Sequence, residues 1–355
     1  MKLTLSKDHA LPTGVLGLAV TPEADRGFAA CVDGSILSVD LATGKADAFE
    51  ARHGAYASGC VLLPDGRTLI SGGYDGTLLW HDIGTRRCWR RLAAHRFWSW
   101  QLALSPDGEK VASVTGQYLA GGWKYEPASE EEPSVRVFEA RTGEPVASFS
   151  HTPPVLSCAF SPDGKHLAAA NMLGEVRVWN LGEGTNPEPV ARWTSPDFTS
   201  WGSIKTHHYC GGIYGLAFAP DGSALVGCGM GPMTDPMAGN GKMTWQRWNW
   251  RKGERVDQIR DGQHGSGLME TIVWHPAGSH FLMAGRQAQG TWNAAVFSAA
   301  DGSLAHAIDT KKRITQARFS ADGGRLVIAG AKGQPQRKDG VWPAWGRLQT
   351  YQVEI

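Results

Sequence analysis

The stretch ASGCVLLPDG, residues 57–66, is a short apolar run that ends in the turn signature Pro64-Asp65-Gly66. The signature or a near relative recurs along the chain at Pro22, Pro64, Pro106, Pro162, Pro220, Pro276 and Ala321. The intervals are 42 to 58 residues long, and several strand-like runs fill each of them. A period of this size with several strands per unit is typical of a β-propeller. Because one unit buries little apolar surface alone, we expect all seven to close into one body.

The run before each turn carries two columns of apolar residues, two positions apart. The first column holds Leu18, Cys60, Leu102, Cys158, Leu216, Ile272 and Ala317. The second column holds Val20, Leu62, Leu104, Phe160, Phe218, Trp274 and Phe319. Because alternate residues of a strand share one face, both columns lie on the same side of their strand. We expect this face to pack between blades, with Cys60 and Cys158 buried and unmodified.

Length and composition limit the class of protein. The chain has 355 residues, a formal net charge of +1 and six cysteines without a Cys-x-x-Cys pair. We expect one domain over residues 1–355, because the blades of a closed propeller share interfaces. The charge gives no field that favours nucleic acid or a membrane surface, and no apolar stretch reaches spanning length. The start, MKLTLSKDHA, lacks the apolar segment of a secretory signal, so we expect a cytoplasmic location. We also expect a monomer.

The later strands of each unit, such as TLLWHDIGT (77–85) and EVRVWNLGEG (175–184), resemble those of the WD-repeat family over nearly the whole chain. The family's Trp column corresponds to Ser38, Trp80, Phe138, Trp179, Trp248, Phe297 and Tyr351. Its Gly-His position corresponds to His53, His95 and His151. The resemblance implies an all-β, seven-bladed β-propeller of four-stranded antiparallel blades. In repeat 2 it implies a structural hydrogen-bond set of His53, Ser71, Asp75 and Trp80.

The two ends of the chain predict how the ring closes. KLTLSKDHA (2–10) matches the fourth strand of a repeat, whereas GRLQTYQVEI (346–355) matches a third strand with nothing after it. We expect the N-terminal strand to complete the last blade beside the C-terminal strand. That pairing removes the exposed edges that an open sheet would leave.

The long connections are predicted to lie on one face. With the strands of a blade called a to d, the b–c and d–a connections share a face, which is often called the top in WD-repeat proteins. The longest segments are of these kinds: 115–134, 194–212, 229–243, 285–292 and 330–346. Loops on a rigid scaffold commonly carry function. Blades 1 and 2 have only tight turns at Asp33-Gly34 and Asp75-Gly76, so we expect a cleft entered from their side.

Aromatic residues gather in and beside these segments. Exposed aromatic clusters favour recognition, although the rings could instead pack the loops against each other. In WD-repeat proteins partner contacts often come from two positions that flank the start of strand a, and Trp98 and Trp100 occupy them in blade 3. The predicted partner-binding residues are Tyr56, Trp98, Trp100, Tyr214, Glu270, Arg313, Trp123, Trp201, Trp342 and Trp345. The alternative for Trp100 is that it plugs the propeller core.

Other chemistry finds little support in the sequence. His207-His208-Tyr-Cys210 could begin a metal site with Asp235 or His264, but the spacing matches no zinc pattern. The glycines of 227–231 mimic part of a phosphate loop without the helix that would follow it. We expect no metal and no cofactor, and a non-catalytic scaffold that binds a protein or peptide on the long-loop face. The alternative is a small-ligand or carbohydrate binder, or a hydrolytic enzyme, with an aromatic-lined cleft on the same face.

Overall fold

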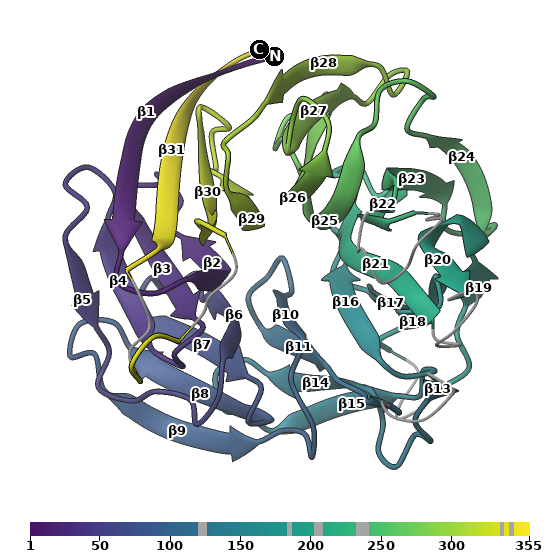
Figure 1. Cartoon of the computed structure of the whole chain (residues 1–355). Coiled ribbons are helices and arrows are strands. Elements are labelled where there is room, and N and C mark those ends of the chain that lie inside the picture. The colour runs from purple at the N-terminus through teal and green to yellow at the C-terminus, as the bar shows by residue number, and fades with distance from the viewer. Residues whose placement is uncertain (120–125, 183–186, 202–208, 232–240, 334–336, 341–343) are drawn as a thin grey trace.

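The computed structural model describes residues 1–119, 126–182, 187–201, 209–231, 241–333, 337–340 and 344–355. Within these ranges, seven antiparallel sheets stand side by side in a ring around a central channel (Figure 1). Six of these sheets have four strands. The remaining sheet, which is fifth along the chain, has an additional short strand at its edge. The predicted all-β, seven-bladed propeller is confirmed.

Blades 1 to 4 follow the chain order of the repeats. Blade 1 consists of β2 (Val15–Val20), β3 (Arg26–Cys31), β4 (Ile36–Asp40) and β5 (Ala46–Ala48). Blade 2 consists of β6 (Ala57–Leu62), β7 (Thr68–Gly73), β8 (Thr77–Asp82) and β9 (Cys88–Ala93). Blade 3 consists of β10 (Gln101–Leu104), β11 (Lys110–Val114), β14 (Val135–Glu139) and β15 (Pro145–Phe149), with β12 (Tyr118–Leu119) and β13 (Glu126–Pro127) paired separately. Blade 4 consists of β16 (Val155–Phe160), β17 (His166–Asn171), β18 (Glu175–Asn180) and β19 (Ala191–Thr194).

Blades 5 to 7 complete the ring. A short 3₁₀ helix, η1 (Pro196–Phe198), leads into blade 5. Blade 5 consists of β20 (Thr199–Trp201), β21 (Tyr209–Phe218), β22 (Leu225–Met230), β23 (Met243–Asn249) and β24 (Glu254–Gln258). Blade 6 consists of β25 (Ser266–Trp274), β26 (His280–Gln289), β27 (Ala294–Ser298) and β28 (Leu304–Ile308). Blade 7 consists of β29 (Arg313–Phe319), β30 (Arg325–Ala331), β31 (Gly346–Glu354) and β1 (Lys2–Leu11).

The ring is closed by the N-terminal strand, as predicted. β1 pairs antiparallel with β31, from Lys2 opposite Glu354 to Leu11 opposite Gly346. The two strands run side by side and the termini lie together (Figure 1). Leu11 is buried against its neighbours, so β1 contributes to the core as well as to the sheet.

The repeated turn signature has a structural explanation. In blade 3 the hydroxyl of Ser105 donates a hydrogen bond of 2.5 Å to Asp107, which also accepts one from the backbone N–H of Glu109. These hydrogen bonds lower the pKa of Asp107. Gly108 follows with a φ of 73°, a conformation that glycine adopts without strain. The aspartate and glycine of the signature therefore fix the turn between strands a and b.

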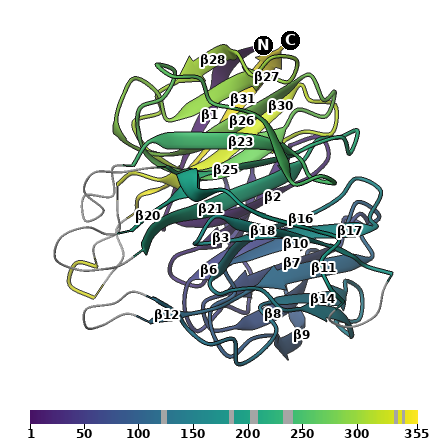
Figure 2. The same cartoon turned by 90° about the vertical axis from the view of Figure 1, so that its right-hand side faces the viewer.

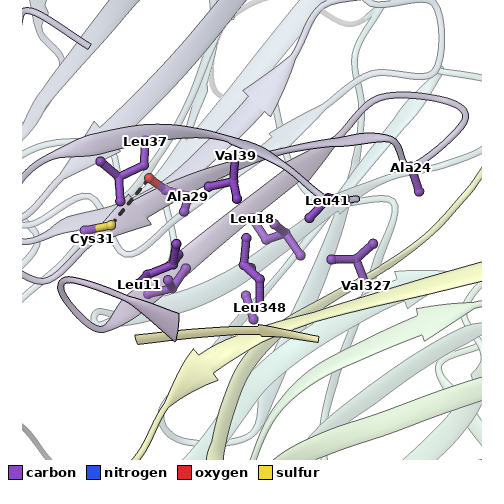
Figure 3. Packing of buried hydrophobic residues seen from close by; sticks show 12 residues of the cluster. Leu11, Leu18, Ala24, Ala29, Cys31, Leu37, Val39, Leu41, Val327 and Leu348 are labelled. Atoms are coloured by element: carbon purple, nitrogen blue, oxygen red, sulfur yellow. Dashed lines mark hydrogen bonds between the residues drawn. The ribbon is translucent and has the colours of Figure 1, made fainter. Parts of the chain in front are cut away.

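The core lies between the blades, where the two predicted columns pack. In blades 2 to 7 the two columns face the preceding blade and pack against an alanine or valine three positions before that blade's turn, as Cys158 and Phe160 pack against Ala103. At the junction of blades 7 and 1, Leu18 packs with Val327 and Leu348 (Figure 3). Cys60 and Cys158 are buried and unpaired, and burial raises the pKa of each thiol to about 12. The prediction for this face is confirmed.

The hydrogen-bond set of repeat 2 contains a histidine where we predicted Trp80. His53 contacts Asp75 at 3.0 Å and Ser71 at 2.9 Å, and Ser71 contacts His81 at 3.0 Å. Trp80 instead points into the core between blades 2 and 3 and donates a hydrogen bond of 2.7 Å to a backbone carbonyl. The family's Trp position in this repeat is therefore His81, because a shift of one residue moves a side chain to the other face of the sheet.

Cross-strand register reveals the same shift in repeat 1. Trp179 lies opposite Leu167 in blade 4, and the equivalent position in blade 1 is Val39 opposite Gly27. Our assignment of Ser38 to the family's Trp column is therefore wrong by one residue, and Val39 occupies that position. The other five assignments agree with the register.

Described parts of the long connections lie on one side of the ring. Seen edge-on, β12 and β20 lie toward the same side (Figure 2). Acidic residues at 130–132, within the blade 3 segment 115–134, contribute to the structure there. Glu130 accepts hydrogen bonds from the backbone of Ser134 and His151, and Glu132 accepts one from the backbone of Arg96. Parts of the segments that would border the predicted cleft, among them 120–125, 202–208 and 232–240, lie outside the described residues, so the cleft stays a prediction.

Candidate functional site

A β-bulge recurs near the start of the innermost strand of the blades. In β25, for example, the pairing with β26 skips Glu270, and in β21 the pairing with β22 skips Tyr214. The residues skipped in this way are Leu16, Ser58, Leu156, Tyr214, Glu270 and Thr315. In blade 3 the equivalent residue is Trp100, which directly precedes β10. A bulge re-aims the side chain of the extra residue.

The six bulged residues and Trp100 line one cavity of about 280 Å³ at the top of the channel, which we call the upper mouth. Trp100, Tyr214, Glu270 and Arg313 are among the predicted partner-binding residues that meet there. The sequence therefore predicted that these four side chains share a location. That they bind a partner stays a prediction.

An aromatic cluster of Tyr56, Tyr74, Phe97, Trp98 and Trp100 borders the mouth on the side of blades 2 and 3. Trp98 is stacked on Tyr74 with ring centroids 4.4 Å apart, and on Phe97 at 4.8 Å. Tyr56 lies 5.6 Å from Tyr74 and is 37% exposed. The cluster thus packs internally, as the alternative interpretation predicted, while its outer end reaches solvent.

Trp100 has both of the roles that we considered for it. Its ring meets Trp98 edge-on at 5.2 Å and lines the upper mouth. Its indole N–H donates a hydrogen bond of 3.0 Å to the carbonyl of Gly116, and the ring packs on the core between blades 3 and 4. Truncating Trp100 would therefore disturb the fold as well as the mouth.

On the opposite side of the mouth, Glu270 and Arg313 form an ion pair between blades 6 and 7. The guanidinium donates two hydrogen bonds to the carboxylate, of 2.7 and 2.6 Å, and both side chains are mostly buried. The charge of Glu270 raises the pKa of Arg313. We predicted these residues as separate contacts for a partner, but each already neutralises the other.

Arg286, which we did not predict, stands beside this pair. It is half-buried and lines both the upper mouth and an adjoining groove of about 480 Å³ between blades 6 and 7. Its guanidinium makes no hydrogen bond or ion pair with the residues that the structure describes. Lys312 in the same groove is paired with Asp8 at 2.6 Å, and Lys311 with Asp309 at 2.5 Å. Among the described residues that line this groove, Arg286 is thus a cation without an ion-pair partner, unlike Lys311 and Lys312.

The other predicted aromatic residues do not extend the surface. Trp345 is only 6% exposed and packs over Gly14, where an added Cβ would meet its ring at 2.8 Å. Its burial makes Trp345 part of the core, contrary to our prediction. Trp201 ends β20 opposite Tyr209, and nothing is described of its side chain. Trp123 and Trp342 lie outside the described residues.

The segments considered for metal and phosphate binding contribute little to this site. The described residues contain no group of three or more His, Cys, Asp or Glu that could hold a metal ion. His207, His208 and Asp235 lie outside the described residues. Most of the glycine-rich segment 227–231 belongs to β22, a strand paired on both sides, so it does not form a phosphate loop. Among the described residues, no helix is long and apolar enough to cross a membrane.

Comparison with known proteins agrees with the fold. The family "WD domain, G-beta repeat" matches residues 51–82 and 143–180, which contain strands a to c of blade 2 and the end of blade 3 followed by strands a to c of blade 4. The chain therefore contains WD repeats in both of these ranges. In this WD-repeat chain, the matched range 51–82 includes the set of His53, Ser71, Asp75 and His81.

Several curated proteins are similar to about half of this WD-repeat chain. Apoptotic protease-activating factor 1 of Rattus norvegicus is 29% identical over 168 residues, which are 47% of this chain and 12% of the relative. WD repeat-containing protein SL1-17 of Schistosoma mansoni is 25% identical over 171 residues, 48% of this chain and 52% of the relative. Protein groucho of Drosophila melanogaster is 27% identical over 173 residues, 48% of this chain and 20% of the relative. The matches thus span between about an eighth and about half of the relatives' own lengths.

Proposed function

We propose that this WD-repeat propeller is a non-catalytic scaffold that binds a protein or peptide partner over the upper mouth. The observation that carries the proposal is the recurring bulge, which directs a different side chain from each blade into one cavity. A rigid ring that presents varied side chains at one place suits selective recognition. The name of the rat relative, a protease-activating factor, also describes action on another protein.

The aromatic cluster supplies the contact area for such a partner. Tyr56 is exposed at its outer end, and Trp98 stacks on both Tyr74 and Phe97. Rigid aromatic rings provide large contact areas at a low cost in conformational entropy, and they dominate the energetics of many interfaces. We propose that the partner contacts the edges of these rings and continues across the mouth toward Tyr214.

Two observations favour this function over a carbohydrate site or a hydrolytic enzyme. Trp98 is already stacked on Tyr74 and on Phe97, so a sugar would have to compete with these rings for its faces. Among the described residues that line the upper mouth, Glu270 is the one carboxylate, and it is held by Arg313. A hydrolytic site that uses paired carboxylates for acid and base catalysis would need a second one nearby.

The proposal is tested by capturing partners from an extract of the source organism with the immobilised chain. The double variant Tyr56→Ala with Trp98→Ala should lose a partner that the native chain retains, because truncating a central aromatic typically costs about 2 kcal/mol or more. Trp89→Ala is the matched control, since Trp89 is 51% exposed on β9, the last strand of blade 2. Full retention by a folded double variant, checked by circular dichroism, would contradict the proposed surface.

A further inference from the structure

Below the upper mouth, the channel widens into a cavity of about 930 Å³ lined by the innermost strands of all the blades, which we call the lower channel. One column of its lining consists of the residues three positions before each turn. These residues are Ala19, Val61, Ala103, Ala159, Ala217, Val273 and Arg318. Six blades thus use alanine or valine at this position, and blade 7 alone uses arginine.

The packing between blades explains why a small residue is usual there. Ala159 packs against Leu216 and Phe218 of the next blade. Val273 packs against Ala317 and Phe319 in the same way. An arginine at this position adds a long side chain where the other junctions accommodate a methyl or isopropyl group. Packing between blades therefore does not require Arg318.

The guanidinium of Arg318 is only partly used by the protein. Its Nη1 donates to the side-chain oxygen of Gln316 at 2.8 Å and to the carbonyl of Ala317 at 2.9 Å. Its Nε and Nη2 have no partner among the described residues. The residues that line the lower channel are all described, and they include no aspartate or glutamate. Arg318 is therefore a half-buried cation without a counter-charge, and burial lowers its pKa.

Two glutamines add further donors where the lower channel meets the upper mouth. Gln101 and Gln316 line both cavities. The side-chain oxygen of Gln101 accepts a hydrogen bond of 2.8 Å from the backbone N–H of Cys158, and that of Gln316 is held by Arg318. Because both oxygens are engaged, each amide presents its NH₂ group, which donates only. These NH₂ groups are hydrogen-bond donors, and they lie near a guanidinium that has no counter-charge in the lower channel. Such a combination favours the binding of an anion.

We propose that the channel binds a small oxyanion at Arg318, with inorganic phosphate as the simplest ligand of this class. The free Nε and Nη2 form the side of the guanidinium that binds two oxygens of a phosphate or carboxylate at once. The amide of Gln316 adds a donor to the same anion. This proposal does not depend on the proposed partner, because Arg318 lies in the lower channel.

The test is calorimetric titration of the full chain with inorganic phosphate against chloride at constant ionic strength. The native chain should bind phosphate, and Arg318→Gln should weaken binding about tenfold or more, because hydrogen bonds to charged groups are worth about 1.5 to 3 kcal/mol. Arg87→Gln is the matched control, since it removes an equal charge from a side chain that is 77% exposed. Acetate serves as a second probe, and acetate binding that depends on Arg318 supports a site for oxyanions of both kinds.

A second pair of variants keeps the test decisive if Arg318→Gln is unstable. Arg318→Val introduces the residue that blade 6 carries at this position, so it should fold and bind no phosphate. Gln316→Glu places a carboxylate beside Arg318 and should also abolish binding. Absence of phosphate binding by the native chain, or undiminished binding by a folded variant of Arg318, would overturn the proposal.

Discussion

The two ends of the innermost strands differ in how far they follow the repeat. Toward the turns, the strands keep a regular register, and six of the seven junctions pack a small residue against bulkier ones of the next blade, as at Ala103 and Phe160. Toward the upper mouth, the bulge releases one residue per blade, and its identity changes from Ser58 to Tyr214 to Glu270. Repetition at the lower ends specifies the fold, whereas variation at the upper ends provides a surface that can be specific.

Deleting residues 1–8 should have the largest effect on stability, because it destabilises both the upper and the lower end of blade 7 at once. The deletion removes most of β1, including buried Leu3, and exposes the edge of β31. We expect the melting temperature to fall by about 10 °C or more, since each kcal/mol shifts it by about 2 to 4 °C in domains of moderate size. Thermal unfolding followed by circular dichroism measures this loss, and an unchanged melting curve would show that the ring closes without β1.

A pair of alanine substitutions compares the two ends directly. Phe160→Ala, at the lower end of β16, should cost about 3 to 5 kcal/mol because it leaves a cavity between blades 3 and 4. Tyr214→Ala, at the upper end of β21, should cost less than half as much, because Tyr214 is a half-buried residue at the mouth. Urea unfolding of both variants gives the comparison. Equal losses would mean that the upper ends are as important to the fold as the lower ends.

Buried histidines predict a smaller, pH-dependent effect on stability. Burial lowers the pKa of His81 to about 4, well below the ordinary value of 6.5. Between these two values the unfolded chain binds a proton that the folded chain does not, so stability falls as the pH drops through this window. The loss from His81 should approach about 3 kcal/mol at pH 4, at about 1.4 kcal/mol per pKa unit.

His81→Trp, which restores the family's residue, isolates this contribution. Its free energy of unfolding, measured in urea at pH 7 and pH 4.5, should change less than that of the native chain. The remaining dependence comes from groups such as His95 and His151, whose pKa burial lowers to about 3. Equal pH dependence in the two proteins would refute the assignment to His81.

Most of the fold could be predicted from the sequence because its determinants recur. The turn signature and the two apolar columns appear once per repeat, so an error in one repeat is corrected by the others. The assignment of Trp80 failed because Trp80 and His81 are adjacent aromatic residues, and an apolar run does not reveal which of two neighbours faces the next blade. Only the cross-strand register decides between them.

The site was only partly predictable because its contacts join different blades. Trp100 and Tyr214 could be predicted to lie at the mouth, because the position at the start of strand a recurs in every repeat. The pairing of Glu270 with Arg313 could not be foreseen, because the two residues are 43 positions apart and no local pattern connects them. Tyr74 lies beside a turn and Arg286 near the end of a strand, and only the closed ring brings them to the mouth.

The central claim is that a partner sits over the upper mouth, and site-specific photo-crosslinking tests it most directly. A photoreactive phenylalanine analogue is placed at Tyr56 in one protein and at Trp89 in another, and each is irradiated with the captured partner. Both positions are exposed aromatic residues of blade 2. We predict a covalent product with the partner from position 56 and none from position 89. A product from position 89 alone would place the partner on the outside of the ring and contradict the account.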